Sequence, residues 1–324
     1  MRDVLVTGGA GFIGSHACKA LAASGYRPIA LDNLKHGHAD AVRWGPLIVG
    51  DIGEANVFAE VFDQYDIAAV IHFAAYAYVG ESVTDPGLYY RNNVAGTLTL
   101  LEAMRDFGCN RLVFSSSCAT YGVPSVIPIT EASPQEPINP YGSSKLMGER
   151  MIADFRSAHG IRAIALRYFN AAGADPDGEL GERHEPETHL IPLALDAAAG
   201  GRELSVFGDD YPTPDGTCVR DYIHVSDLAR AHVAALDLLE QKGEAPAALN
   251  LGTGIGISVR QIIAAVEQAT GCKVPHRIAP RRPGDPPILV ADPAEASVRL
   301  GWKPEWSRLE QMVQTAWAWR NQAA

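Results

Sequence analysis

The sequence lacks several features that would place it in other classes of protein. Although 47% of its 324 residues are hydrophobic, no uninterrupted apolar run reaches the roughly 18 residues of a membrane-spanning helix. Lys and Arg number 27 against 38 Asp and Glu, which gives a formal net charge of −11. We therefore expect no nucleic-acid partner, because such a partner calls for a basic patch. No internal repeat or low-complexity segment stands out.

Cysteine is also scarce, and its placement excludes some kinds of site. The five cysteines are odd in number and form no C-x-x-C motif: Cys18, Cys109, Cys118, Cys218 and Cys272. This pattern argues against a disulfide framework or a cysteine zinc site and indicates reduced thiols in the cytoplasm. The first residues, MRDVLVTGGAGFIG, reach glycines where a signal peptide would need an apolar block. We expect a cytoplasmic protein that needs no metal.

A glycine cluster near the start predicts a phosphate-binding turn. The glycines fit G-x-G-x-x-G as Gly9, Gly11 and Gly14, and they equally fit G-x-x-G-x-x-G from Gly8. Glycine is needed where the turn visits positive φ, where a pyrophosphate approaches the backbone and where a helix packs closely on a strand. The helix that follows presents unpaired N–H groups and the positive end of its dipole to a phosphate.

The acidic residue that ends the second predicted strand, RPIALDN, indicates which dinucleotide binds. A carboxylate at Asp32 can accept hydrogen bonds from both hydroxyls of a ribose and would repel a 2′-phosphate. This favours NAD over NADP, although Lys35 is close in sequence.

Apolar strand patterns alternate with helical ones along the first half of the chain. We predict further strands at 47–52, 68–75, 111–117 and 162–170, with helices at 86–106 and about 141–158. Such alternation specifies right-handed crossovers, hence a doubly wound parallel α/β (Rossmann) sheet with ligands at the carboxyl ends of its strands. Residues 1–172 with about 222–252 should form an NAD-binding domain, and 173–221 with 253–324 a smaller α/β domain that caps the substrate.

The segment PYGSSK contains a pair of residues suited to proton transfer. Tyr141 and Lys145 lie four residues apart and so share one helix face, and Ser117 ends the preceding strand at the same sheet edge. A free tyrosine has a pKa of about 10, so it is a poor base at neutral pH. An ammonium about 5 Å away stabilises the phenolate by roughly 3 kcal/mol at an effective dielectric of about 20. With Ser117 as a relay, Tyr141 can take the proton of an alcohol beside NAD.

Longer motifs carry a resemblance that covers nearly the whole chain. TGGAGFIG, NPYGSSK and LRYFNAAGA resemble the extended short-chain dehydrogenase/reductase superfamily. YYRNNVAGT, FGDDYPTPDGTCVRDYIHV, NLGTG and RRPGD are similar to the UDP-glucose 4-epimerase (UDP-galactose 4-epimerase) family. The resemblance implies a tightly bound NAD, regenerated in each turnover: C4 of a UDP-sugar is oxidised, the 4-keto sugar turns over, and hydride returns to the opposite face. It also implies galactose metabolism and a homodimer built on helices 88–106 and 141–158.

The same resemblance implies a role for each matching residue. Tyr141 would be the base, Ser117 the relay, and Lys145 would hold the nicotinamide ribose and polarise the tyrosine. The implied cofactor set is Gly8, Gly11, Phe12, Ile13, Gly14, Asp32, Asn33, Asp51, Ile52, Phe73, Ala74, Ala75, Asn92, Ser115, Tyr141, Lys145 and Tyr168. The implied substrate set is Ser117, Tyr141, Asn170, His189, Leu190, Phe207, Arg220, Arg282 and Asp285. Arginine suits a diphosphate because its planar fork bonds two oxygens at once.

Three positions depart from the family pattern and leave the sugar open. Ala77 stands where a lysine often supports the cofactor, and His189 where an asparagine usually precedes Leu190. Leu289 lies at a gate where tyrosine excludes N-acetylated sugars and a small residue admits them. SSSCATYG and INPYG also resemble a branch that interconverts UDP-xylose and UDP-arabinose. Hexose, pentose and N-acetylhexosamine substrates all stay open.

Other functions fit the residues less well. A nucleotide-sugar 4,6-dehydratase needs an acid and a base beside the relay hydroxyl, where those enzymes resemble Thr-Asp-Glu and this chain reads Ser117-Cys118-Ala119. A decarboxylase would need a uronate substrate. A non-catalytic NAD-sensing Rossmann protein typically loses the Tyr–Lys pair, which is intact here, and a hydride-releasing dehydrogenase would consume NAD. We therefore predict 4-epimerisation.

Overall fold

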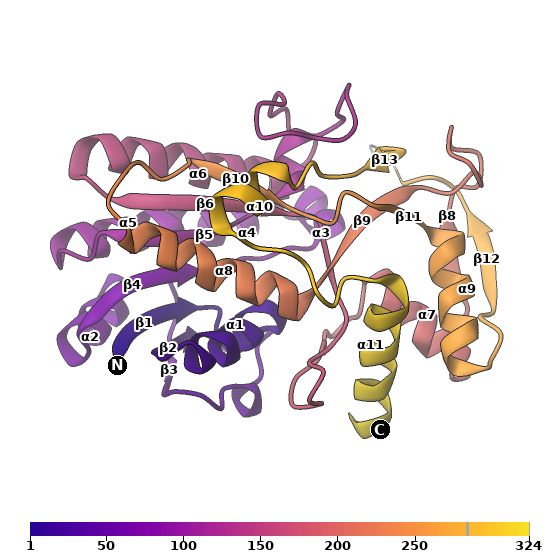
Figure 1. The fold of residues 1–324 in the computed structure, drawn as a ribbon, viewed down its shortest axis with the longest axis horizontal. Helices are drawn as coiled ribbons and strands as arrows, with labels where there is room; N and C mark the ends of the chain where they lie inside the picture. Colours follow the sequence, from indigo (N-terminus) through magenta and orange to yellow (C-terminus); the bar gives the residue numbers. More distant parts are fainter. Residues whose placement is uncertain (283–284, 324) are drawn as a thin grey trace.

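The structure is a computed structural model that describes residues 1–282 and 285–323. Within them, a parallel sheet of seven strands runs in the order β10-β6-β5-β4-β1-β2-β3 (Figure 1). The strands are β1 (Arg2–Thr7), β2 (Tyr26–Asp32), β3 (Leu47–Val49), β4 (Ile67–His72), β5 (Arg111–Ser117), β6 (Arg162–Tyr168) and β10 (Ala248–Leu251).

Helices cover both faces of this sheet, which explains why its strands are apolar almost throughout. Successive side chains on β1 serve opposite faces: Val4 packs with α1 (Phe12–Ala23) and α8 (Val225–Glu240). Leu5 packs instead with α2 (Ala55–Gln64), α5 (Gly96–Asp106) and α6 (Pro140–His159). The two helix layers therefore enclose two separate apolar cores.

The helix predicted at 86–106 is interrupted. Pro86–Tyr89 form α4, Tyr90–Ala95 form a π-helical turn (η2), and α5 begins only at Gly96. The buried side chain of Asn93 explains the interruption, because it accepts a hydrogen bond from Tyr76 N at 2.9 Å and donates to Tyr76 O at 3.0 Å. A π turn inserts an extra residue into the helix. Here it turns Asn93 toward the loop that follows β4.

Three predicted strands are shorter than expected. The strand predicted at 47–52 ends at Val49, the one predicted at 68–75 ends at His72, and the one predicted at 162–170 ends at Tyr168. Asn170 instead begins β7 (Asn170–Ala172), which pairs with β9 (Val219–His224) in a second sheet. The chain thus leaves the main sheet two residues earlier than its apolar pattern indicated.

The second sheet contains β9 with β11 (Gly256–Ser258), β13 (Ile288–Leu289) and β7. A two-stranded sheet joins β8 (Leu204–Phe207) to β12 (His276–Ala279). A further apolar cluster is built on α7 (Leu190–Ala198), α9 (Val259–Thr270) and α11 (Leu309–Ala323), which lie beside these strands (Figure 1). The remaining helices are α3 (Val79–Thr84) and α10 (Ala294–Leu300), with short 3₁₀ turns at Ala39–Ala41 and Cys118–Tyr121.

The strand order reverses at β1, whose neighbours are β2 and β4. In an open α/β sheet, a crevice lies at the carboxyl ends of the strands on either side of such a reversal. The two strand ends are tied there, since Phe73 N donates to Thr7 O at 2.9 Å and Ala74 N donates to it at 3.1 Å. This edge is where a ligand site should be sought.

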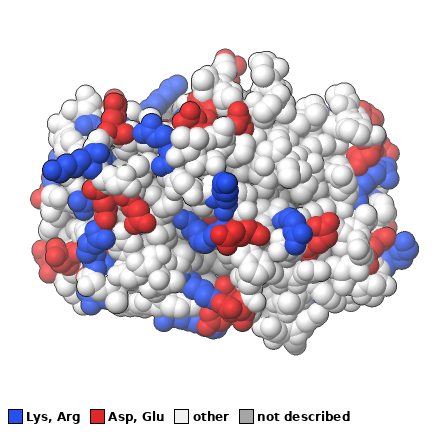
Figure 2. Space-filling model, viewed as in Figure 1, with Lys and Arg blue, Asp and Glu red and all other residues white. Residues whose placement is uncertain are grey.

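Three general expectations can be compared with the structure. No helix in the described part of the chain combines the length and the apolar character needed to cross a bilayer. All five cysteines lie in the described part and carry free thiols. Figure 2 shows acidic and basic side chains interspersed on the face in view, rather than gathered by sign.

Candidate active site

The glycine-rich turn between β1 and α1 forms an open cradle. Gly8 has a φ of +73°, and a Cβ on Gly14 would lie 2.1 Å from the Gly8 carbonyl oxygen. Neither position therefore tolerates a side chain. Gly11 is the N-cap of α1 and has no side chain with which to satisfy the first N–H groups of the helix. These donors suit an anionic group such as a pyrophosphate.

Three polar residues lie beyond this cradle, at the ends of β2 and β3. Asp32 is 8% exposed, and it accepts hydrogen bonds from Ala10 N at 3.0 Å and from Leu34 N at 2.9 Å. Burial raises the pKa of Asp32. Asn33 donates to Asp51 at 2.9 Å, so the two form one hydrogen-bonded edge. The donor set fits the adenosine half of NAD: backbone N–H groups for phosphate and a carboxylate for ribose hydroxyls.

The other residues expected to contact the cofactor lie at the ends of strands of the main sheet or in the helices and loops that follow them. Phe12 and Ile13 are the first residues of α1, and Phe73, Ala74 and Ala75 follow β4. Ile52 is buried in the loop after β3. Asn92 lies in the π turn, and Tyr168 is the last residue of β6. The Tyr168 hydroxyl hydrogen-bonds the Ser115 hydroxyl at 2.5 Å. Ala77, where the family often has lysine, is exposed.

The three expected catalytic residues converge where α6 meets the end of β5. Ser117, Tyr141 and Lys145 are 7%, 8% and 4% exposed. The Ser117 hydroxyl neighbours the Tyr141 phenol and acts to lower its pKa, which favours the phenolate. The Lys145 ammonium lies one helical turn further along α6 and donates to the Ser115 carbonyl oxygen at 2.8 Å.

Local sequence explains this convergence. Asn139 caps α6 by accepting a hydrogen bond from Gly142 N at 2.8 Å, so the helix begins at Pro140 and Tyr141 falls in its first turn. A Cβ on Gly142 would lie 2.4 Å from the Ala119 carbonyl oxygen. Glycine at 142 is therefore what lets the helix approach the segment that carries Ser117.

Burial is the main influence on the pKa values of Tyr141 and Lys145 within the protein. It raises the pKa of Tyr141, and the neighbouring Ser117 hydroxyl offsets this only in part. Burial also lowers the pKa of Lys145 to about 7. Desolvation therefore penalises the charged forms of both Tyr141 and Lys145 in this pocket.

Four of the expected substrate residues meet at the edge of the smaller sheets. Arg220, on β9, forms an ion pair with Asp285. The guanidinium carbon of Arg282 lies 4.0 Å from the centre of the Phe207 ring. Asp285 N donates to Arg282 O at 3.2 Å, which links the two pairs. Pro283 and Gly284 of the RRPGD motif lie outside the described residues.

The remaining expected substrate residues are placed separately. Asn170 begins β7, and Leu190 begins α7 with His189 as its N-cap. The His189 imidazole contacts Glu182. Leu289 pairs with Arg220 between β13 and β9, and it packs in one apolar cluster with Cys118, the residue after Ser117. The smaller sheets thus reach the catalytic segment through Leu289.

Two supporting groups escaped the sequence analysis. Asn93 donates to the Ser144 hydroxyl at 3.0 Å, which joins the π turn to α6. Glu149 forms a buried ion pair with Arg167 at 2.6 Å, with side chains 10% and 8% exposed. The only sequence signal for Glu149 is its position four residues after Lys145, on the same face of α6.

Comparison with known proteins identifies the group to which this arrangement belongs. Residues 4–252 match the NAD dependent epimerase/dehydratase family. A UDP-glucose 4-epimerase from Rhizobium meliloti (strain 1021) is 52% identical over 323 residues, which cover 99% of this chain and 97% of that one. The chain belongs to the NAD-dependent epimerase/dehydratase family.

Solved structures of family members share the whole fold. A UDP-glucose 4-epimerase from Brucella ovis, solved with NAD, is 57% identical, covers 98% of each chain and has a TM-score of 0.95. A UDP-glucose-4-epimerase from Stenotrophomonas maltophila, with bound NAD and formylated UDP-arabinopyranose, is 41% identical, covers 100% of each chain and has a TM-score of 0.95. The α/β fold and the UDP-glucose 4-epimerase resemblance predicted from the sequence are confirmed.

Proposed function

We propose that this chain interconverts UDP-sugars that differ in configuration at C4, with NAD as a tightly bound cofactor. One observation carries the proposal: Ser117, Tyr141 and Lys145 are all buried where α6 meets the carboxyl end of β5, the edge of the sheet at which the glycine turn also opens. The Rhizobium meliloti relative is a UDP-glucose 4-epimerase, and the UDP-glucose 4-epimerase of Brucella ovis was solved with NAD. The chain is accordingly an NAD-dependent UDP-sugar 4-epimerase.

The chain's own groups would hold the cofactor along the crevice. The N–H groups around Gly8, Gly11 and Gly14 would bind the pyrophosphate, and Asp32 would accept hydrogen bonds from the hydroxyls of the adenosine ribose. Lys145 and Tyr168, which both hydrogen-bond Ser115, would hold the other ribose. When bound, NAD would supply a reversible hydride acceptor for C4 and, in its oxidised form, a positive charge.

Proton transfer falls to three side chains. Ser117 takes the proton of the C4 hydroxyl and passes its own to Tyr141, then reverses both steps when the hydroxyl is restored. Lowering a tyrosine pKa from about 10 to about 7 requires about 4 kcal/mol in favour of the phenolate. A charged Lys145 about 5 Å away supplies roughly 3 kcal/mol at an effective dielectric of about 20. The neighbouring Ser117 hydroxyl, which acts to lower the Tyr141 pKa, contributes to the remainder.

The smaller sheets provide a site for the UDP moiety. Arg220 and Arg282 would bind the diphosphate, with Phe207 beside the uracil, while Asn170, His189 and Leu190 complete the contacts. The Asp285 carboxylate fixes the Arg220 guanidinium, so less rotamer entropy is lost on binding. This arrangement supports UDP-sugar binding across two segments distant in sequence.

The proposal also concerns which UDP-sugars are the substrates. UDP-glucose and UDP-galactose are the expected pair. Leu289 and Cys118 pack against the same apolar cluster, and the intermediate size of the leucine leaves room for alternative sugars. The Stenotrophomonas maltophila relative holds formylated UDP-arabinopyranose, which supports including a UDP-pentose in the test. The Ser117-Cys118-Ala119 segment offers no acid for the elimination step of a 4,6-dehydratase.

Domain division, assembly and location remain proposals. The division at about residue 172, with a return at about 222–252, is supported by β10, which lies in the main sheet, and by α8, which packs with α1. The homodimer is supported by exposed apolar side chains on its two expected helices, Leu98 at 39% and Met147 at 41%. We also retain the cytoplasmic location expected from the cysteine pattern.

The decisive experiment supplies purified protein, without added NAD, with UDP-galactose, UDP-arabinose and UDP-N-acetylglucosamine in separate reactions. Chromatography of both epimers should show equilibration of at least one pair. Tyr141→Phe should keep its bound dinucleotide and lose turnover. A dehydratase would yield a 4-keto-6-deoxy sugar, a dehydrogenase would need added NAD in stoichiometric amount, and an NAD sensor would turn over nothing. If no pair equilibrates in protein that carries dinucleotide, the proposal fails.

A further inference from the structure

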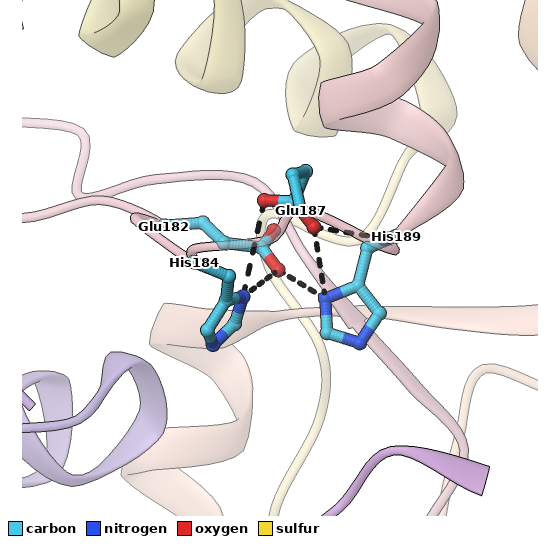
Figure 3. A group of neighbouring side chains, drawn as sticks. All are labelled: Glu182, His184, Glu187 and His189. Carbon is cyan, nitrogen blue, oxygen red and sulfur yellow. Dashed lines mark hydrogen bonds and ion pairs between the residues drawn. The ribbon is translucent and has the colours of Figure 1, made fainter. Parts of the chain in front are cut away.

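Four side chains outside the catalytic trio meet in the segment between β7 and α7. Figure 3 shows the imidazoles of His184 and His189 directed at the carboxylate of Glu182, with Glu187 alongside. His184 Nδ1 lies 3.0 Å from Glu182 Oε1, and His189 Nδ1 contacts the same oxygen. Each Nδ1 atom also lies 3.8 Å from an oxygen of Glu187. One ligand atom from each residue lies within 4.8 Å of the others.

We propose that Glu182, His184, Glu187 and His189 form a binding site for a divalent transition-metal ion, of which Zn²⁺ fits best. In a tetrahedral zinc site with bonds of about 2.0–2.1 Å, neighbouring ligand atoms lie about 3.3 Å apart. The separations of 3.0 and 3.8 Å fall on either side of that value. Two imidazoles with two carboxylates favour zinc over Ca²⁺ or Mg²⁺, which prefer oxygen alone.

The side chains are held before any ion binds. The Glu182 side chain is only 6% exposed and that of His184 16%. The His184 ring packs edge-on against Phe12 and Tyr78, with centroids 6.4 and 6.1 Å apart. Glu187 Oε1 accepts hydrogen bonds from Thr188 N at 2.7 Å and from His189 N at 2.8 Å. A site held in this way needs little reordering to take up an ion.

A second group of carboxylates in the described residues is neutralised by a lysine of the chain itself and serves as a comparison. Asp175, Asp177 and Glu179 also gather their carboxylates, but Lys19 lies at their centre, at 2.8, 2.7 and 2.7 Å. The chain thus supplies its own cation there. At the Glu182 cluster the positions around the carboxylates are taken by imidazole nitrogens, which bind a metal once neutral.

The location indicates a structural role for the ion. His184 lies against Phe12 at the start of α1, and His189 immediately precedes α7. An ion would fasten residues 182–189 beside the glycine turn on one side and beside the UDP segment on the other. Metal binding through Nδ1 leaves Nε2 of His189 for a substrate contact. The inference is independent of the sugar and of turnover.

The test measures metal uptake by the full-length, untagged protein. Apoprotein prepared with a chelator is titrated with Zn²⁺ against a chromophoric competitor, and Co²⁺ is added separately. We expect about one tightly bound Zn²⁺ per chain, the visible absorption of tetrahedral Co²⁺, and a higher thermal midpoint with Zn²⁺. The double variant His184→Gln/His189→Gln should lose affinity by at least about 100-fold and lose the thermal shift.

Two further variants keep the test decisive. Glu187→Gln removes one ligand at a half-buried position and should weaken Zn²⁺ uptake. It replaces the double variant in the test if the double variant does not fold. Asp177→Asn, whose side chain is 74% exposed in the Lys19 cluster, should bind Zn²⁺ as the wild type does. No Zn²⁺ uptake by the wild type, or equal uptake by the wild type and the folded variants, overturns the proposal: the four residues would then be an ion-paired loop. Epimerase activity without Zn²⁺ uptake would leave the proposed function standing.

Discussion

The Lys145 ammonium donates a hydrogen bond of 2.8 Å to the carbonyl oxygen of Ser115. This contact joins α6 to β5 and holds a buried charge at the sheet edge where Ser117 meets Tyr141. The pocket that enables the chemistry therefore costs stability, because it desolvates a lysine. Function and stability should respond in opposite directions to changes at this residue.

Replacing Lys145→Met should lower turnover strongly and raise stability near pH 6. Burial lowers the Lys145 pKa to about 7. That lies below the value of about 10.4 in the unfolded chain, so the unfolded state binds more protons between these limits. Unfolding free energy should rise with pH across that window, and the full penalty, up to about 5 kcal/mol, applies below pH 7. Chemical denaturation of both proteins at pH 6 and pH 9 checks this. The unfolding free energy of the wild type should lie further below that of Lys145→Met at pH 6 than at pH 9. The same difference at both pH values would contradict the prediction.

Ser117→Ala should reduce kcat by about 10²- to 10⁴-fold, because the proton relay is lost. Ser117→Thr keeps a hydroxyl and should retain more activity. Both variants should keep their bound dinucleotide, which absorbance of the released cofactor measures. If Ser117→Ala turned over at the wild-type rate, Tyr141 would have to reach the sugar directly.

Gly14→Ala should destabilise the glycine turn or release the dinucleotide, since its Cβ would lie 2.1 Å from the Gly8 carbonyl oxygen. We expect a loss of several kcal/mol, about 3 or more, in unfolding free energy. Gly80→Ala is the matched control, because a Cβ there meets nothing within 4 Å and the residue lies in α3. Thermal melting and dinucleotide content distinguish the two, and equal behaviour of both variants would refute the close packing.

Stability should fall steeply between about pH 6.5 and pH 4. Burial lowers the pKa of His16, His224 and His232 to about 4 and that of His72 to about 3. The folded values lie below the unfolded value of about 6.5, so the unfolded chain takes up more protons as the pH falls. Each histidine adds a slope of about 1.4 kcal/mol per pH unit within that window. Urea denaturation from pH 7 to pH 4.5 measures the total.

His232→Leu isolates one contribution to that slope. His232 is fully buried with Nε2 unpartnered in the described structure, so an apolar replacement removes a titrating group without exposing another. Below pH 6.5, unfolding of the variant should take up about one proton fewer than unfolding of the wild type. His276→Gln, at an exposed position, is the control and should leave the slope unchanged. Identical slopes for His232→Leu and wild type would rule out the neutral state of His232.

Local sequence sufficed for much of the fold and the site. The strand at 111–117 and the helix after Asn139 lie where their patterns placed them. The pair Tyr141 and Lys145 was recognisable because a helix brings residues four apart onto one face, whatever surrounds it. By contrast, the π turn at 90–95 follows from the Asn93 side chain bonding to Tyr76. That contact spans separate elements and leaves no periodic signal.

By itself, the sequence determined the order of strands and helices, the glycine turn and the spacing of the proton-transfer residues. Each of these depends on interactions within a few residues along the chain. Only the tertiary structure decided that Lys145 bonds Ser115, that Glu149 pairs with Arg167, and that Glu182 and Glu187 meet two imidazoles. It also decided the direction of the Tyr141 and Lys145 pKa shifts. Desolvation depends on how many distant elements pack around a group, and that number is set only when the chain has folded.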